Sequence, residues 1–97
     1  MPQYEPVLHT RANDELKRLP DEDRERLAET IKDVCKHRQP TEHPRSKHLE
    51  GQDGKFRIRV GELRAVCELD KPLLKIYIIN YRNGVYDSID ETLELRA

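Results

Sequence analysis

The chain has 97 residues, of which 38% are charged and 35% hydrophobic, and its net charge at pH 7 is −1. This length predicts a single domain, residues 1–97, with one modest core. No run approaches the roughly 20 apolar residues that a membrane span needs, and no apolar segment follows the N-terminus as in a secretory signal. We therefore expect a soluble, cytoplasmic protein without a membrane partner.

Charge is distributed unevenly along the chain. Residues 1–31 carry five Lys/Arg against eight Asp/Glu, residues 32–64 carry nine against five, and residues 65–97 carry four against six. The near-zero sum argues against a protein that coats nucleic acid indiscriminately. A basic centre between acidic ends indicates a local site for an anion.

The N-terminal third predicts an edge strand and two helices. Residues 4–8 contain a proline, which confines the strand to a sheet edge. Thr10 can cap a first helix that ends near Leu19, and Pro20 suits the first turn of a second helix that runs to about His37. The second helix carries an amphipathic apolar stripe of Leu27, Ala28, Ile31, Val34 and Cys35. We expect the two helices to form a hairpin packed on one face of a sheet.

The rest of the chain predicts strands. Residues 38–54 contain two prolines and two glycines without a period, and are expected to be a loop. Three β-type runs follow at 55–60, 63–70 and 73–80, and their short spacings predict an antiparallel meander. A capping box predicts a short C-terminal helix over 88–95. The expected fold class is α+β, with an N-terminal helical hairpin packed on a small antiparallel sheet.

Cysteine and histidine usage predicts no metal centre and no cofactor. Cys35 and Cys67 occupy apolar positions of a helix and a strand, so buried free thiols are expected. His37, His43 and His48 lie near Cys35 in the sequence, but their spacing matches no compact pair of zinc ligands.

The strand at 55–60 alternates cationic and apolar residues. Lys55, Arg57 and Arg59 project from one face, and the apolar residues between them project from the other. A turn at Gly61-Glu62 then brings Arg64 beside them. Such a strand suits a polyanion better than a protein core, which indicates a phosphate backbone as partner.

Further along the chain, Arg82 and Tyr86 follow the last strand. If the three strands are neighbours, these two residues could line one concave sheet face with Arg57, Arg59 and Arg64. The planar fork of arginine pairs two donors with phosphate oxygens, and tyrosine can stack on an unpaired base or relay a proton. Each residue also has a structural alternative. The strand arginines can be solvated cations, Arg64 can pair with a nearby glutamate, and the tyrosines can close the core.

The same residues carry a resemblance to a known family. The chain looks like toxins of the RelE/ParE superfamily, the small proteins of bacterial and archaeal toxin–antitoxin pairs. The resemblance covers nearly the whole chain, and the matching segments are residues 16–20, 48–51, 56–64 and 81–86. It implies a RelE-like fold.

The RelE branch implies an mRNA interferase that enters the ribosomal A site. The implied reaction is attack of a ribose 2′-hydroxyl on the adjacent phosphate, leaving a 2′,3′-cyclic phosphate, without a metal ion. By position, Arg57 and Arg59 match the two strand cations of the family, Arg64 and Arg82 match its phosphate-stabilising arginines, and Tyr86 matches its C-terminal tyrosine. The implied partners are a RelB-like antitoxin, the ribosome and mRNA. The candidate RNA-binding residues are Arg45, Lys47, Lys55 and Tyr81.

Two departures from the family shape these expectations. Better-known members have lysine where this chain has Arg57 and Arg59, and arginine effectively never deprotonates. These residues are thus expected to hold charge, with Tyr86 as the candidate for proton transfer. The chain is also slightly acidic, whereas RelE toxins are usually strongly basic. A ParE-like inhibitor of DNA gyrase and a degenerate toxin that retains only antitoxin binding remain as alternatives.

Overall fold

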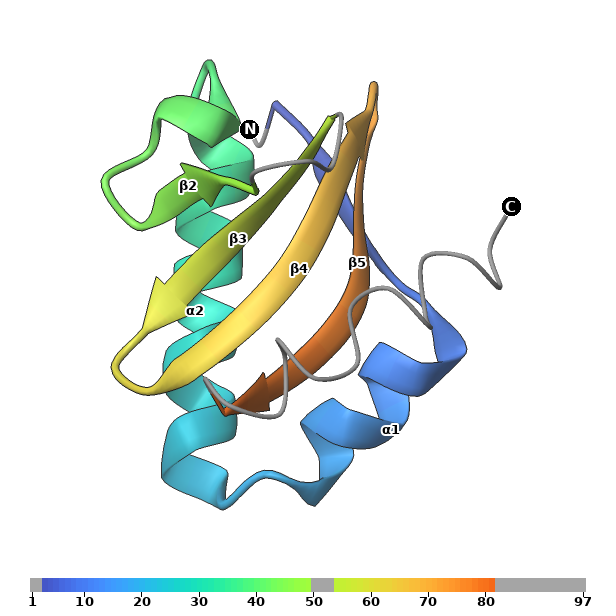
Figure 1. The fold of residues 1–97 in the computed structure, drawn as a ribbon, viewed down its shortest axis with the longest axis vertical. Coiled ribbons are helices and arrows are strands. Elements are labelled where there is room, and N and C mark those ends of the chain that lie inside the picture. Colours follow the sequence, from blue (N-terminus) through green and yellow to red (C-terminus); the bar gives the residue numbers. More distant parts are fainter. Residues whose placement is uncertain (1–2, 50–53, 82–97) are drawn as a thin grey trace.

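A computed structural model describes residues 3–49 and 54–81, which form two helices and a five-stranded sheet (Figure 1). The strand order is β1-β5-β4-β3-β2. Neighbours from β2 to β5 are antiparallel, and β1 runs parallel to β5, so the sheet is mixed. In chain order the elements are β1 (Glu5–Leu8), α1 (Thr10–Arg18), α2 (Asp21–Lys36), the 3-10 turn η1 (Pro40–Glu42), β2 (Ser46–His48), β3 (Lys55–Val60), β4 (Leu63–Asp70) and β5 (Leu73–Tyr81).

Both expected helices are confirmed, and their caps differ from expectation by one residue. Thr10 is the first residue of α1, and the cap is His9, whose Nδ1 accepts the backbone N–H of Arg11 at 3.3 Å. Pro20 is the N-cap of α2, and three acidic residues fill the first turn. These carboxylates complement the positive end of the helix dipole. Neither helix within the described part of the chain is long and apolar enough to cross a membrane.

The strand pairing confirms the predicted antiparallel meander, and the structure corrects the predicted loop over residues 38–54. β3, β4 and β5 pair in sequence as antiparallel neighbours, and β1 is an edge strand as expected. The loop predicted over 38–54 was wrong in part, because it contains η1 and β2. A strand of three residues is too short to show alternation. The C-terminal helix expected over 88–95 lies outside the described residues.

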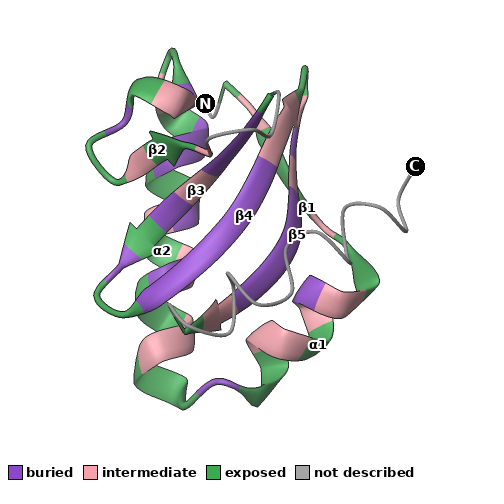
Figure 2. Cartoon of the chain, in the orientation of Figure 1, coloured by how far each residue is buried: buried purple, intermediate pink, exposed green. Residues whose placement is uncertain are grey.

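One face of the sheet packs against both helices and forms the main core (Figure 1, Figure 2). The two cysteines are buried in it as free thiols, as expected. The helices contribute Ala12, Leu27, Ile31, Val34 and Cys35, the C-cap of α1 contributes Leu19, and the strands contribute Phe56, Ile58, Val60, Leu63, Ala65, Cys67, Leu74, Ile76 and Ile79.

A bulge in β5 builds a second, smaller cluster on the opposite face. Val66 pairs with Ile78 but Cys67 pairs with Ile76, so Tyr77 is an extra residue in the ladder. A bulge re-aims the side chains beside it. Tyr77 consequently joins Val66 and Ile78 in a buried cluster, against which Leu49 packs.

Candidate functional site

The strand register gathers cations on the face of the sheet that points away from the main core. Arg57 lies directly opposite Lys47 of β2, and Arg59 lies directly opposite Arg64 of β4. Directly opposed residues project from the same face. The apolar residues that alternate with these arginines along β3 are buried in the main core. We call Lys47, Arg57, Arg59 and Arg64 the cationic face.

These two opposed pairs carry like charges. Oppositely charged side chains in such positions stabilise a sheet by about 0.2–1 kcal/mol, and like charges destabilise it. The register places Lys47 opposite Arg57 and Arg59 opposite Arg64, so like charges lie side by side on this face.

A small cavity opens beside the cationic face between β2 and β3. Its volume is about 150 Å³. The backbone N–H of Arg59 donates to the carbonyl of Arg45 at 2.8 Å, which holds the segment before β2 along the end of β3. The cavity is lined by Pro44, Arg45, Ser46, Lys47, Arg57 and Arg59. Guanidinium and ammonium donors around one hollow are the groups that bind phosphate oxygens in proteins.

Arg64 is held by the turn that precedes it. Its side chain is buried, and Nη1 donates to the carbonyls of Gly61 at 2.7 Å and Leu63 at 2.9 Å. Gly61 has a φ of +58°, which the two-residue connection between β3 and β4 requires. The turn therefore sets Arg64 opposite Arg59 and also fixes its guanidinium group.

Lys55 lies at the other end of β3 and is part of a different network. Its Nζ is 2.5 Å from Oε2 of Glu68, and Oε1 of Glu68 accepts the hydroxyl of Tyr77 at 2.7 Å. Lys55 is only 8% exposed. This lysine was a candidate for RNA binding, and the structure places it in an ion pair beside the second cluster.

Tyr81 lies away from the cationic face. It pairs with Leu63, which faces the helices, and its hydroxyl donates to Oδ2 of Asp23 in α2 at 2.7 Å. This hydrogen bond to a carboxylate raises the pKa of Tyr81. The candidate residues Arg82 and Tyr86 lie outside the described residues. The structure thus brings together three of the five candidate catalytic residues, with the candidates Arg45 and Lys47 beside them.

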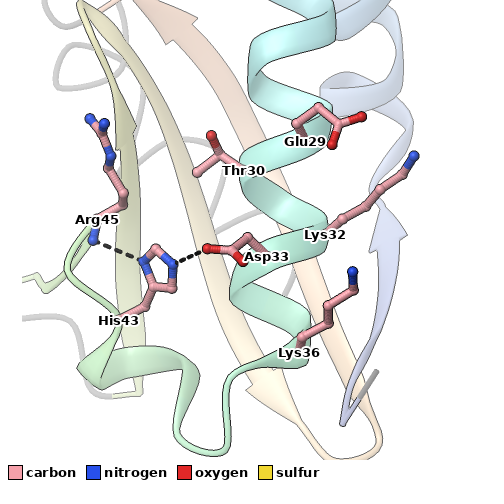
Figure 3. Close-up of a pocket in the computed structure, with 7 residues that line it drawn as sticks. All are labelled: Glu29, Thr30, Lys32, Asp33, Lys36, His43 and Arg45. Atoms are coloured by element: carbon pink, nitrogen blue, oxygen red, sulfur yellow. Dashed lines mark hydrogen bonds and ion pairs between the residues drawn. The ribbon is translucent and has the colours of Figure 1, made fainter. Parts of the chain in front are cut away.

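A second polar site lies on α2, around Asp33 and His43 (Figure 3). The sequence pattern did not reveal it. His43 is buried, its Nε2 is 2.7 Å from Oδ2 of Asp33, and its Nδ1 accepts the backbone N–H of Arg45 at 3.0 Å. The hydrogen bond with His43 lowers the pKa of Asp33. The residues line a hollow of about 410 Å³ together with Glu29, Thr30, Lys32 and Lys36. Asp33 and His43 are ten residues apart across a reversal of the chain, so no spacing rule joins them.

Among residues 3–49 and 54–81, no three His, Cys, Asp or Glu side chains gather closely enough to hold a metal ion.

Comparisons with known proteins establish the fold. No protein-family model matches the chain, and no curated protein matches its sequence. Among solved structures, a RelB–RelE antitoxin–toxin complex from Methanococcus jannaschii is similar with a TM-score of 0.69 and 21% identity, over 84% of this chain and 95% of that one. The toxin–antitoxin complex RelBE2 from Mycobacterium tuberculosis is similar with a TM-score of 0.67 and 22% identity, over 84% and 100%.

A free mutant of the Escherichia coli toxin RelE is similar with a TM-score of 0.72 and 18% identity, over 97% of both chains. The similarity thus extends over nearly the full length of both proteins. The chain has the RelE fold, as its sequence led us to expect.

Proposed function

We propose that this chain is the toxin of a toxin–antitoxin pair and acts as a ribosome-dependent endoribonuclease. The observation that carries the proposal is the cationic face. In each of its two pairs, two cations lie opposite each other on adjacent strands. Several arginine and lysine side chains gathered on one sheet face are suited to binding the phosphates of a polyanion. The RelE fold supports the same reading, because the solved neighbours are RelE toxins, two of them in complex with antitoxin.

In the proposed reaction the RNA backbone lies along the cationic face. A ribose 2′-hydroxyl attacks the adjacent phosphorus, the bond to the 5′-oxygen of the next nucleotide breaks, and a 2′,3′-cyclic phosphate remains. Arg57, Arg59 and Arg64 hold the negative charge that grows on the phosphate oxygens. Because arginine keeps its proton, the resemblance leaves Tyr86 for proton transfer and assigns Arg82 to the phosphate.

The proposed partners follow from the same face and fold. Since the whole chain is slightly acidic, we propose that contact with ribosomal RNA is confined to the basic residues 32–64, with mRNA on the cationic face, the adjoining Arg45 and the candidates Arg82 and Tyr86. A RelB-like antitoxin is the proposed inhibitor. The chain would act in the cytoplasm, where translating ribosomes are found.

The test uses purified protein and ribosomes programmed with a short mRNA. Cleavage products are mapped by primer extension, and their ends are assayed for the cyclic phosphate. Removing one donor that stabilises transition-state charge costs about 10²- to 10³-fold in kcat, so we expect a loss of this order for Arg59→Ala. Arg59 is exposed, so its replacement by alanine should not disturb the fold. Arg18→Ala, on the surface of α1, is the matched control.

Three results would contradict the proposal. The first is growth arrest on expression without mRNA cleavage, and the second is full cleavage by Arg59→Ala. The third is inhibition of gyrase supercoiling by the purified protein, which would favour the ParE-like alternative. A protein that causes no growth arrest at all would be a degenerate toxin.

A further inference from the structure

We infer that His43 is a positioning residue, which together with Asp33 fastens the segment carrying Arg45 and Lys47 to α2 and so places these cations beside the strand arginines. The inference rests on the proposed function for its link to RNA. The hydrogen-bonded anchor itself is a property of the fold.

The donors around His43 define its tautomer. The backbone N–H of Arg45 can only donate, so Nδ1 of His43 accepts and carries no proton. The remaining ring proton then lies on Nε2 and is donated to the carboxylate of Asp33. The imidazole thus connects a backbone amide of the segment before β2 to a side chain of α2 (Figure 3).

Further bonds make the anchored segment rigid. The backbone N–H of Ser46 donates to the carbonyl of His43 at 2.8 Å, which closes a four-residue turn around Arg45. The carbonyl of Arg45 in turn accepts the N–H of Arg59. Both backbone groups of Arg45 are therefore occupied, one by the imidazole and one by β3.

Arg45 lies between the hydrogen bonds of His43 and the cationic face, where RNA is proposed to bind. It lines the hollow on α2 and also the cavity beside the cationic face. Lys47 follows two residues later and lies opposite Arg57. Releasing the amide of Arg45 from His43 would free the segment that leads into β2, which is only three residues long and pairs with a single neighbour.

The energetics distinguish this role from a general contribution to stability. The side chain of Asp33 is 71% exposed, and ion pairs at exposed positions add little to the stability of a protein. Removing the carboxylate should therefore leave global unfolding close to wild type while loosening the segment locally. Local opening of this kind appears in the exchange of individual amide protons.

Four variants separate the two bonds of the imidazole. Asp33→Ala removes the anchor on α2, and His43→Ala removes both bonds. His43→Asn keeps an acceptor for the amide two residues on, as asparagine does in an Asx turn, but loses contact with Asp33. Lys32→Ala removes an exposed side chain from the lining of the same hollow and is the matched control.

The first readout is exchange of the Arg45 amide proton, followed by NMR on the full chain. A hydrogen bond contributes about 0.5–1.5 kcal/mol, which corresponds to exchange about 2- to 12-fold faster when it is lost. We expect this acceleration in full in His43→Ala. It should be smaller in Asp33→Ala and in His43→Asn, because each keeps an acceptor for the amide and loses only the contact with α2, and it should be absent in Lys32→Ala. Unchanged exchange in both His43→Ala and Asp33→Ala would overturn the inference.

The second readout is cleavage of mRNA on programmed ribosomes. Misplaced cations weaken binding, so KM should rise about fivefold in Asp33→Ala while kcat stays within about twofold. A fall in kcat at constant KM would overturn the positioning role. If the wild-type protein cleaves no RNA, the proposed function fails, whereas amide exchange still decides whether the anchor exists.

Discussion

Replacing Lys55 by methionine distinguishes a structural lysine from one that binds RNA. Lys55 is 8% exposed and its partner Glu68 has a side chain that is 17% exposed, so both charges are largely removed from water. Methionine retains the aliphatic length of lysine and removes only the charge. The variant therefore removes the ammonium group that lies 2.5 Å from Oε2 of Glu68 in the sheet face.

The magnitude follows from this burial. Removing one partner of a fully buried ion pair costs about 3–5 kcal/mol. Glu68 retains some contact with water and the hydroxyl of Tyr77, so we expect about 2 kcal/mol for Lys55→Met. For a domain of this size that loss lowers Tm by roughly 10 °C. The double variant Lys55→Met/Glu68→Gln should lose less than the sum of the single changes, with a coupling of about 1–2 kcal/mol.

Urea unfolding followed by circular dichroism measures these changes, and mRNA cleavage is measured in parallel below the unfolding transition. Lys47→Met is the matched control, because Lys47 is exposed on the same sheet face. We expect Lys47→Met to weaken RNA binding with little loss of stability, and Lys55→Met to do the reverse. The reasoning is refuted if Lys55→Met unfolds within about 0.5 kcal/mol of wild type, since surface substitutions have effects of that size.

Three further outcomes follow from the polar groups and thiols. Because the hydrogen bond with His43 lowers the pKa of Asp33 in the fold, its small contribution to stability is present above the ordinary value of 3.8 and is lost as the pH falls through the folded pKa; an NMR titration of the Asp33 carboxyl should have its midpoint below 3.8 in wild type and closer to 3.8 in His43→Ala. Burial raises the pKa of Cys35 to about 11 and that of Cys67 well above 9.0, so a thiol reagent at neutral pH should label both only after denaturation. The hydrogen bond to Asp23 raises the pKa of Tyr81 above 10.0, so the stability that this bond contributes is fully present below pH 10.0 and is lost as the pH rises through the higher pKa of the folded state. The ultraviolet difference titration between wild type and Tyr81→Phe should have its midpoint above pH 10.0.

Much of the fold could be predicted from local periodicity. The strands β3, β4 and β5 and the stripe of α2 follow from alternation and from helical spacing, because each buries one regular face. β2 did not follow, since a strand of three residues that begins two residues after Pro44 shows no period. The parallel position of β1 also required a pairing between distant segments that no local pattern contains.

In the candidate site, too, some features follow from local sequence patterns and others depend on residues that are distant in the sequence. Arg57 and Arg59 share a face because a strand alternates, and Arg64 joins them because Gly61 allows a two-residue turn. The different surroundings of Lys55 and Tyr81 depend on cross-strand and helix partners, Glu68 and Asp23, which are distant in sequence. Local spacing could not reveal these partners.

The parallel pairing of β1 with β5 has a consequence for synthesis of the chain. Residues 5–8 leave the ribosome early, yet they pair with residues 73–76. All four members of the cationic face lie on β2, β3 and β4, so this face is fully synthesised before β5. The main core closes later, because it needs Leu74, Ile76 and Ile79 of β5. A nascent chain therefore carries the complete cationic face before the strand that closes the main core has been synthesised.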